Sequence, residues 1–507
     1  MISIADPNIK SGITLFDNVF KDIDFSFFGG TDKVEKLKNL ILFDKSCIKR
    51  RQEVFSDILE NEGLIAFFDK LCEKLDAIED MASSRKNAAL YSSNEGLLYS
   101  FRELGVYTEC IETIINAGEI FKEKVKSEWL IELFEYATKI KNETWYKNTS
   151  KFLSETDEKI RDIKSITLGI NLDAELRPKE AGIVSINDKP YVANTILDKL
   201  FSEKAESKEY VAVSVLCKNE FGIDARQMNS LTGQVYSALN SMFSKTLVKI
   251  KGVLQKAEWE NALLNIISEE IRFVKNGADY ILSMKAKGLP VCMPDFSDGD
   301  EFICDLYYPG LSLYTKTADI VKNDAAFDEN GRIFILTGQN SGGKSVFLRA
   351  VGVCYVLFQL GLPIPAKSAK MRLVDGFFTH FITKANMTVG GRLENECRSI
   401  SEICKKMTSD SLLLMDESFS STGSKDGAII AEEVLDFLSK KGCRCIYATH
   451  MHELLDKIEI ISNEKSASRI DLLSVDPQNK YKIERKRGDG ASHALEIFKK
   501  YGLELKS

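Results

Sequence analysis

Proline is scarce in this sequence, with only nine among 507 residues. None lies between Pro7 and Pro178, and none lies between Pro190 and Pro290. Because proline interrupts the interior of a helix, both stretches can hold long helices. The apolar fraction of 44% and the charged fraction of 28% exclude a collagen-like or disordered chain. At roughly 150 residues per domain, the length predicts about three domains.

Metal-binding spacings and an excess of positive charge are also absent. The four histidines and eleven cysteines are scattered, so we expect no zinc site and reduced thiols. A net charge of −7 argues against a domain that binds nucleic acid through bulk charge. Any contact with DNA would come from local clusters such as Lys245, Lys249, Lys251 and Lys256, although such a run is also typical of a solvated helix face.

Long hydrophobic runs are missing as well. No stretch of roughly 18 apolar residues occurs, and the first residues, MISIADPNIK, do not have the pattern of a secretory signal. The sequence therefore predicts a cytoplasmic protein without a membrane partner.

The first part of the chain has a helical pattern with a β-rich interruption. Apolar residues recur at helical spacing, as at Ile111, Ile114 and Ile115. After residue 163 they alternate instead, as strands do, and the helical spacing then resumes up to residue 287. We predict a mostly α-helical core and outgoing lever over 1–162, a small β-containing clamp over 163–222 and returning lever helices over 223–294.

The last part of the chain has short β-rich runs that alternate with helical segments. The strand-like runs are 332–337, 412–415 and 443–448, and helical segments follow the first two. Such alternation indicates an α/β sheet whose core is mostly parallel. We therefore assign 295–507 to an α/β domain.

The strongest motif in this domain is a glycine-rich loop between a strand and a helix. Residues 338–345 fit the P-loop pattern G-x-x-x-x-G-K-[ST]. The glycines let backbone N–H groups surround a phosphate, and the next helix adds the positive end of its dipole. Lys344 is predicted to reach the β- and γ-phosphates of ATP, and Ser345 to bind Mg²⁺. The predicted nucleotide-binding residues of this loop are Gly338, Gln339, Asn340, Ser341, Gly342, Gly343, Lys344 and Ser345.

Two carboxylates follow the next apolar strand. Asp416 is predicted to hold Mg²⁺ with Ser345, and Glu417 to orient or deprotonate the attacking water. A third strand-like run ends at His450, which is predicted to contact the γ-phosphate. Together these elements indicate an ABC-type ATPase with Glu417 and His450 as its catalytic residues.

Three segments resemble, in this order, the ATPase domain of the MutS mismatch-repair family: TGQNSGGKS, MDESFSSTGSKDG and YATHMHEL. Thr422, Asp426 and Gly427 keep the family's places in the second segment. More weakly, residues 50–55 resemble the family's R-Q-x-x-V pattern, and residues 488–503 resemble its dimerisation segment. The resemblance implies a homodimer through the ATPase domains and lever helices that lead to a DNA clamp.

The sequence also departs from the family pattern. Because the R-Q element lies at residues 50–55, we expect the family's mismatch-reading and connector domains to be missing, and we also expect no Smr domain after the ATPase. The family's S-G-R-S-T-F signature, which meets the nucleotide of the neighbouring subunit, is replaced by residues 390–395, GGRLEN. Gly390, Gly391 and Arg392 are predicted to take its place against the partner's ATP.

These observations predict a dimeric, ATP-dependent DNA-binding protein of DNA repair. ATP binding would close a clamp on mismatched, branched or otherwise structured DNA, and hydrolysis would reopen it. The altered signature leaves an alternative open, a nucleotide-switched clamp on nucleic acid or ribosomes with little turnover. An SMC-like ATPase is disfavoured because the helical segments are too short. A transporter subunit is disfavoured because the P-loop begins only at residue 338 and no L-S-G-G-Q signature occurs.

Overall fold

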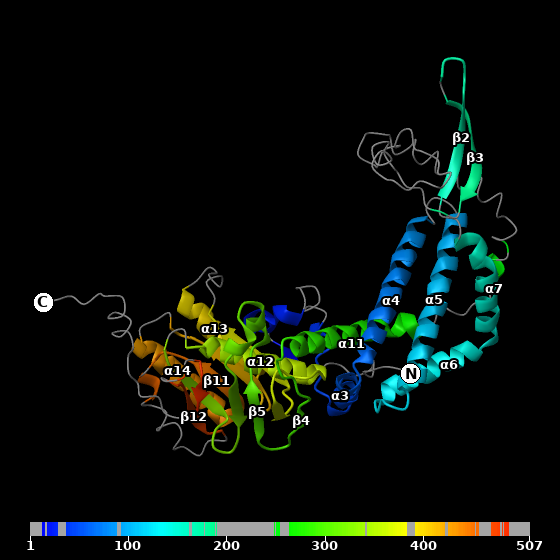
Figure 1. Ribbon diagram of the computed structural model, residues 1–507. Helices are drawn as coiled ribbons and strands as arrows, with labels where there is room; N and C mark the ends of the chain where they lie inside the picture. The colour runs from blue at the N-terminus through cyan, green and yellow to red at the C-terminus, as the bar shows by residue number, and fades with distance from the viewer. Residues whose placement is uncertain are drawn as a thin grey trace. The chain divides into compact units, whose positions relative to one another are not determined.

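The computed structural model describes most of the chain (Figure 1). Two compact units contain these residues. The first unit comprises Met1–Phe68, Phe121–Glu132 and Glu269–Ser507, and the second comprises Asp69–Ile120 and Leu133–Ser268. The described residues are 13–15, 18–28, 37–88, 93–161, 165–176, 178–187, 189, 248, 250–253, 263–339, 342–382, 391–420, 424–451, 453–455, 468–476, 479 and 481–485.

A seven-stranded sheet is the centre of the first unit. All neighbouring strands are parallel except the last pair, β12 and β13, which are antiparallel. Strands β7, β10 and β11 lie at the middle and are almost wholly buried, so they read as continuous apolar runs. The strand order is β1 (Thr14–Leu15), β9 (Gly376–Phe381), β10 (Leu412–Asp416), β11 (Arg444–Ala448), β7 (Ile333–Thr337), β12 (Ile470–Val475) and β13 (Ile483–Glu484).

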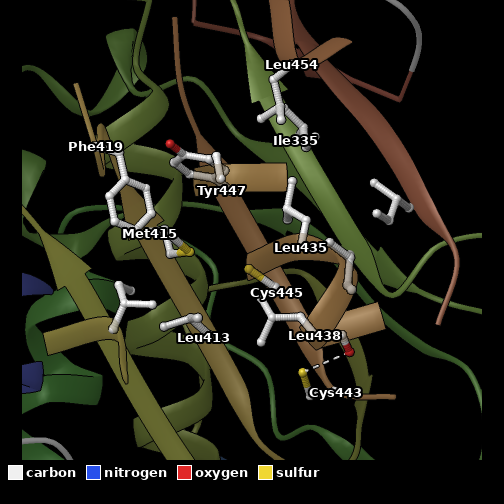
Figure 2. Packing of buried hydrophobic residues seen from close by; sticks show 14 of the residues in the cluster. Ile335, Leu413, Met415, Phe419, Leu435, Leu438, Cys443, Cys445, Tyr447 and Leu454 are labelled. Carbon is white, nitrogen blue, oxygen red and sulfur yellow. Dashed lines mark hydrogen bonds between the residues drawn. The ribbon is translucent and has the colours of Figure 1, made fainter. Parts of the chain in front are cut away.

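Two helices, α13 (Arg392–Lys406) and α14 (Ser424–Lys441), cover one face of this sheet. Figure 2 shows Leu435 and Leu438 of α14 packed toward Cys445 and Leu413 of the strands. Cys445 is fully buried, as the apolar run around it predicts, and the cysteines of the described part of the chain are free thiols. Burial of such side chains stabilises the fold by about 1.5–3 kcal/mol each.

The P-loop helix α12 (Lys344–Leu360) lies against the other face. A methyl group added to Gly352 would lie 3.2 Å from Leu414 of β10 and from Phe377 of β9, so the helix backbone runs close to the sheet. On its far side, Tyr355 donates a hydrogen bond to Glu301 in a second sheet. That four-stranded sheet has the order β4 (Asp295–Phe296), β8 (Ser368–Met371), β5 (Glu301–Leu306) and β6 (Asn323–Phe327).

The carboxyl end of α12 is closed by glycine and by an arginine from far away in the sequence. Gly361 adopts φ of 77°, and the N–H of Leu362 bonds back to the carbonyl of Leu357. This is a Schellman-type end, which needs a left-handed residue after the helix. The guanidinium of Arg51 donates to the carbonyl of Leu360. Its positive charge is also favourable there, because the carboxyl end of a helix carries a partial negative charge. The predicted R-Q element therefore supports the P-loop helix.

Helices from the amino-terminal part complete the first unit. The side chain of Asp44 accepts a hydrogen bond from the N–H of Cys47 and so caps α3. Gln52 of this helix bonds to the carbonyl of Pro294. These elements are α1 (Val19–Asp22), the 3₁₀ turn η1 (Phe25–Phe28) and α3 (Lys45–Glu60). Two further 3₁₀ turns of the first unit, η3 (Pro309–Leu313) and η4 (Thr317–Asp319), come later in the chain.

The second unit is built from helices and one hairpin. Four described helices lie wholly or partly in this unit: α4 (Gly63–Ala88), α5 (Ser93–Phe121), α6 (Glu128–Asn142) and α7 (Thr144–Arg161). Gly118 of α5 lets Phe134 of α6 approach closely, because an added methyl group would lie 3.1 Å from its Cβ. The predicted apolar stripe Ile111–Ile115 is buried in this packing, which confirms it as a helix contact.

The β-rich signal after residue 163 corresponds to an antiparallel hairpin. Strand β2 (Ser165–Leu172) pairs with β3 (Pro178–Asn187), and Ser165 faces Asn187 in the register. Ile170, Leu172 and Val184 of the hairpin are exposed. The remaining residues of the predicted clamp, 190–222, lie outside the described part of the chain.

Secondary structure follows the sequence pattern closely where the pattern is strong. The strand expected at 332–337 is observed at Ile333–Thr337, and the helix after the P-loop begins at Lys344. In contrast, the helical prediction for the amino-terminal region missed strand β1, whose two residues carry no detectable period. Helix α11 (Leu263–Ala286) represents the returning helical segment, which is only partly described. No described helix is long and apolar enough to cross a bilayer.

Candidate nucleotide site

The P-loop connects the buried strand β7 to helix α12. Two of its glycines have backbone conformations that other residues rarely adopt: Gly338 has φ of 139° and Gly343 has φ of 90°. A methyl group at Gly338 would also lie 2.7 Å from Cβ of Val475. Asn340 and Ser341 lie outside the described residues, whereas the other six predicted loop residues are described.

Lys344 begins the helix and turns its ammonium group back over the loop. Its Nζ donates to the carbonyl oxygens of Gly338 at 3.0 Å and Gln339 at 3.2 Å. Burial lowers the pKa of this ammonium, and the carboxylates of Glu417 and Asp416 oppose that change. The loop therefore holds a desolvated positive charge at its centre, which is the chemistry that an anionic phosphate needs.

Asp416 is the last residue of β10, and it lies beside Ser345. Burial raises the pKa of this carboxyl group, while a hydrogen bond with Ser345 lowers it. Its Oδ1 atom is buried and has no hydrogen-bond partner among the residues that the structure describes. A hydroxyl and an unsatisfied carboxylate oxygen suit a hard cation such as Mg²⁺, so these two residues fit the predicted metal role.

Glu417 follows on a turn with a left-handed backbone. Its φ is 57°, and its N–H donates to the carbonyl of Ala448 at 2.9 Å. Its Oε1 atom lies 2.7 Å from Nε2 of His450, and the same nitrogen lies 3.2 Å from Nζ of Lys344. The ends of three neighbouring strands therefore bring Lys344, Glu417 and His450 together, as their positions after parallel strands predict.

These side chains line a cavity of about 570 Å³. Gly342, Ser345, Lys344, Glu417 and His450 form the part of its lining near the P-loop. The volume falls within the range of ordinary small-molecule sites, roughly 300–1,000 Å³. The remaining lining includes aromatic and apolar residues, among them Tyr307, Tyr308, Val321, Phe347 and Tyr481.

The tyrosines of the lining have different environments. Tyr307 donates to the carbonyl of Pro290 and Tyr308 to that of Asp24, and both are almost completely buried. They therefore belong to the core. Tyr481 is 40% exposed, and its ring lies beside Gly343 of the P-loop.

The predicted partner-facing residues lie elsewhere on the first unit. Gly390 lies outside the described residues. Gly391 is the N-cap of α13, and the exposed Arg392 begins that helix; neither residue lines the cavity. The resembling tail segment, 488–503, and Thr422 also lie outside the described residues.

Three further residues near the site were not foreseen. Tyr481 reaches the P-loop because β13 returns antiparallel to β12, a pairing that no local pattern predicts. Glu396 accepts a hydrogen bond from the N–H of Phe419 at 2.6 Å, and His380 lies 2.7 Å from the hydroxyl of Ser418. The sequence carries only a weak signal for two of them: Glu396 is an acidic residue in an amphipathic helix, and His380 is a histidine in an apolar strand.

Comparisons with known proteins agree with these motifs. Residues 334–504 match the model of MutS domain V, and residues 43–266 match that of the MutS2 N-terminal domain. The chain is 30% identical over 245 residues to the DNA mismatch repair protein MutS of Prochlorococcus marinus (strain MIT 9301), covering 44% of this chain and 26% of that protein. It is 25% identical over 320 residues to the protein of that name from Brevibacillus brevis, covering 61% of this chain and 34% of that protein.

The chain spans about a quarter to a third of the length of these relatives. Its matched segments include the P-loop, the Asp416–Glu417 pair and His450, and they also include most of the helical region. The ATPase-type sheet, its motifs and the matched helical region lead to one conclusion. The chain belongs to the MutS family.

Proposed function

We propose that the chain is a MutS-type DNA-binding ATPase in which ATP binding closes a two-subunit site and hydrolysis reopens it. The observation that carries this proposal is the convergence of Lys344, Glu417 and His450 on one cavity of about 570 Å³. The relatives with which the chain aligns are DNA mismatch repair proteins, and this supports DNA as the macromolecular ligand.

Phosphate binding would begin with an exchange of partners at Lys344. Its ammonium group now bonds to two carbonyl oxygens of its own loop. The β- and γ-phosphates of ATP carry full charges and would compete for these donors, and attraction between charges is stronger in a partly buried site than in water. Ser345 and Asp416 would hold Mg²⁺, which neutralises phosphate charge when bound.

Hydrolysis would depend on Glu417 and His450. Glu417 would orient or deprotonate the attacking water, a role that needs its carboxylate free of strong competing donors. His450 contacts both Glu417 and Lys344 through one nitrogen, so a γ-phosphate at Lys344 would change the partner of that nitrogen. We infer that His450 senses the γ-phosphate and adjusts Glu417 to it.

We further propose a homodimer in which Gly390, Gly391 and Arg392 of one subunit complete the nucleotide site of the other. The helices from α4 to α7 and α11 would act as levers, and the segment 163–222 as the clamp. The acidic net charge of −7 favours recognition of DNA shape through local phosphate contacts over bulk attraction. We place this activity in the cytoplasm.

A binding competition tests the proposal directly. Homoduplex, mismatched, four-way-junction and single-stranded DNA of equal length would compete for the purified protein with and without ATP. We expect ATP to change affinity most for mismatched or junction DNA, and that DNA to stimulate hydrolysis. Equal affinity for all four, unchanged by ATP, would contradict the DNA clamp.

A second candidate is a nucleotide-switched clamp on nucleic acid or ribosomes with little turnover. The replacement of the family signature by Leu393, Glu394 and Asn395 after Arg392 favours it, because these residues lack the hydroxyls of the family's serine and threonine. Measurement of ATP turnover with purified ribosomes and with junction DNA separates the two. Stimulation by ribosomes alone would favour the second candidate.

A further inference from the structure

The turn that carries Glu417 contains two strained residues. We define the catalytic turn as residues 417–420. Glu417 has φ of 57° and Phe419 has φ of 63°, both in the left-handed region that costs a residue with a side chain about 1–2 kcal/mol. Such conformations persist only where the surrounding structure holds them. The contacts of the catalytic turn therefore decide where the Glu417 carboxylate lies.

One of these contacts comes from a buried carboxylate on helix α13. Oε2 of Glu396 accepts a hydrogen bond from the N–H of Phe419 at 2.6 Å. The Phe419 side chain is fixed in the core against Met415 and Tyr447 (Figure 2). Because Glu396 is only 7% exposed, its carboxylate depends on protein partners for its stabilisation. A hydrogen bond to a charged acceptor contributes about 1.5–3 kcal/mol.

The other oxygen of the same carboxylate faces a different segment. Oε1 of Glu396 lies 3.3 Å from Nε of Arg392, one helical turn earlier. The Arg392 side chain is 55% exposed and begins α13 directly after Gly391. One buried carboxylate therefore joins the exposed amino end of α13 to the backbone of the catalytic turn.

We propose that Glu396 is a positioning residue that transmits the state of Arg392 to the catalytic turn. A phosphate that captures the guanidinium of Arg392 would withdraw it from Glu396. The N–H of Phe419 would then be the main partner of the buried carboxylate, and that hydrogen bond would strengthen. Through this link, nucleotide bound by one subunit would fix Glu417 in the other. The inference rests on the proposed two-subunit ATPase and names the residue that couples its sites.

Two variants of Glu396 and one matched control test the link. Glu396→Ala removes both contacts, and Glu396→Gln keeps an acceptor for the Phe419 N–H but ends the ion pair. The control is Arg398→Gln, which removes an exposed pair with Glu394 on the same helix. We expect Glu396→Ala to lower the single-turnover rate by about tenfold or more while the Kd for ATP stays within about twofold. The control should match the wild type in both.

Glu396→Gln separates positioning from folding. We expect it to keep a higher single-turnover rate than Glu396→Ala but to lose the rise in turnover with protein concentration that a two-subunit site produces. Arg392→Ala should lose the same rise. Equal losses of ATP affinity and turnover in Glu396→Gln, or an unchanged concentration dependence, would overturn the proposal.

A hydrolysis-independent measurement distinguishes this inference from the proposed function. Amide hydrogen exchange of Phe419 should be slow in the wild type and in Arg398→Gln, and at least about tenfold faster in Glu396→Ala. If the wild type binds ATP without hydrolysing it, the ATPase proposal fails, and the exchange rate still decides the role of Glu396. Unchanged exchange in a folded Glu396→Ala would overturn the link.

Discussion

The Nε2 atom of His450 lies 2.7 Å from Oε1 of Glu417. The same nitrogen is 3.2 Å from the ammonium of Lys344, which can only donate. In a neutral imidazole this nitrogen can donate to Glu417 or accept from Lys344, but it cannot do both. A neutral His450 therefore has two hydrogen-bond states, and we propose that the ligand of Lys344 selects between them.

Glu417→Gln is expected to separate nucleotide binding from hydrolysis. Its amide cannot deprotonate water, and the loss of a general base typically slows a reaction by about 10²–10⁴-fold. We expect ATP binding to persist and an ATP-bound dimer to accumulate, which analytical ultracentrifugation would detect. Glu402→Gln, an exposed change on α13, is the control. A variant that remains monomeric with saturating ATP would contradict the two-subunit site.

Lys344→Ala should abolish nucleotide binding. The variant removes the ammonium group that donates to the carbonyl oxygens of Gly338 and Gln339 and lies 3.2 Å from Nε2 of His450. Equilibrium binding of a fluorescent ATP analogue is the measurement, and the exposed Lys370→Ala is the control. If Lys344→Ala bound the ATP analogue with wild-type affinity, the assignment of Lys344 to phosphate binding would be wrong.

Tyr481 is expected to bind the base of the nucleotide. Its half-exposed ring lies beside Gly343 in the cavity wall, and stacking between a base and an aromatic ring is worth about 1–3 kcal/mol. Tyr481→Ala should weaken ATP binding by about tenfold, whereas Tyr481→Phe should not.

Inorganic tripolyphosphate provides the control ligand for this prediction, because it lacks a base. Its affinity should be the same in the wild type and in Tyr481→Ala. Tyr314→Ala, which removes an exposed aromatic ring outside the lining, should change neither affinity. A matching loss of tripolyphosphate affinity would show that Tyr481 acts on the P-loop and not on a base.

The buried ion pair between Arg444 and Glu301 should be costly to break from one side. Nη1 of Arg444 lies 2.7 Å from Oε1 of Glu301, and both side chains are almost fully buried. Arg444→Met alone should reduce the free energy of unfolding by about 3–5 kcal/mol, because it leaves a buried charge unpaired. Urea denaturation measures this change.

The double variant Arg444→Met/Glu301→Gln should recover part of the loss, since both charges are gone. Asp410→Asn is the matched control, because it weakens the more exposed pair with Arg372 and should cost at most about 1 kcal/mol. If the double variant lost more free energy of unfolding than the two single variants lose together, the account would be contradicted.

His380 should make folding stability sensitive to acid. Burial lowers its pKa from 6.5 to about 4, so the folded state holds the neutral ring. Because the hydroxyl of Ser418 donates to the carbonyl of His380, the Nδ1 atom must carry the proton that bonds back to this hydroxyl. Between pH 6.5 and 4 the unfolded chain binds more protons than the folded chain, so the contribution of His380 falls as the pH is lowered.

The contribution of neutral His380 to the free energy of unfolding should be fully present above pH 6.5. It should be smaller by about 2–3 kcal/mol at pH 4.5. Urea denaturation at pH 7.0, 5.5 and 4.5 measures it. His380→Asn supplies an amide N–H in place of the ring N–H but cannot be protonated in this range, so its stability should vary less with pH than that of the wild type. Parallel pH profiles would contradict the assignment.

Local chemistry decided how much of the site could be predicted. Lys344, Asp416 and His450 each end or begin an element with a strong apolar period, and parallel strands bring such ends to one edge. Glu396 and Tyr481 depend instead on tertiary contacts, one from a helix to a turn and one across an antiparallel edge. No spacing in the sequence encodes either contact.

The same distinction applies to the fold. The central strands were predictable because burial on both faces gives continuous apolar runs. Strand β1 was not, because its two residues gain their conformation only from pairing with β9. Arg51 lies in a recognisable pattern, but its contact with the end of α12 depends on how the first unit packs.

The pairing of β1 with β9 also has a consequence for synthesis of the protein. Thr14 pairs with Gly376, so the two partners leave the ribosome roughly 360 residues apart. At about 5–20 residues per second, this is a delay of roughly 20–70 s. During translation the amino-terminal segment must wait, unpaired, until the edge of the sheet exists. A chaperone that holds this segment, or slow translation before residue 376, would therefore affect the yield of folded protein more than its final stability.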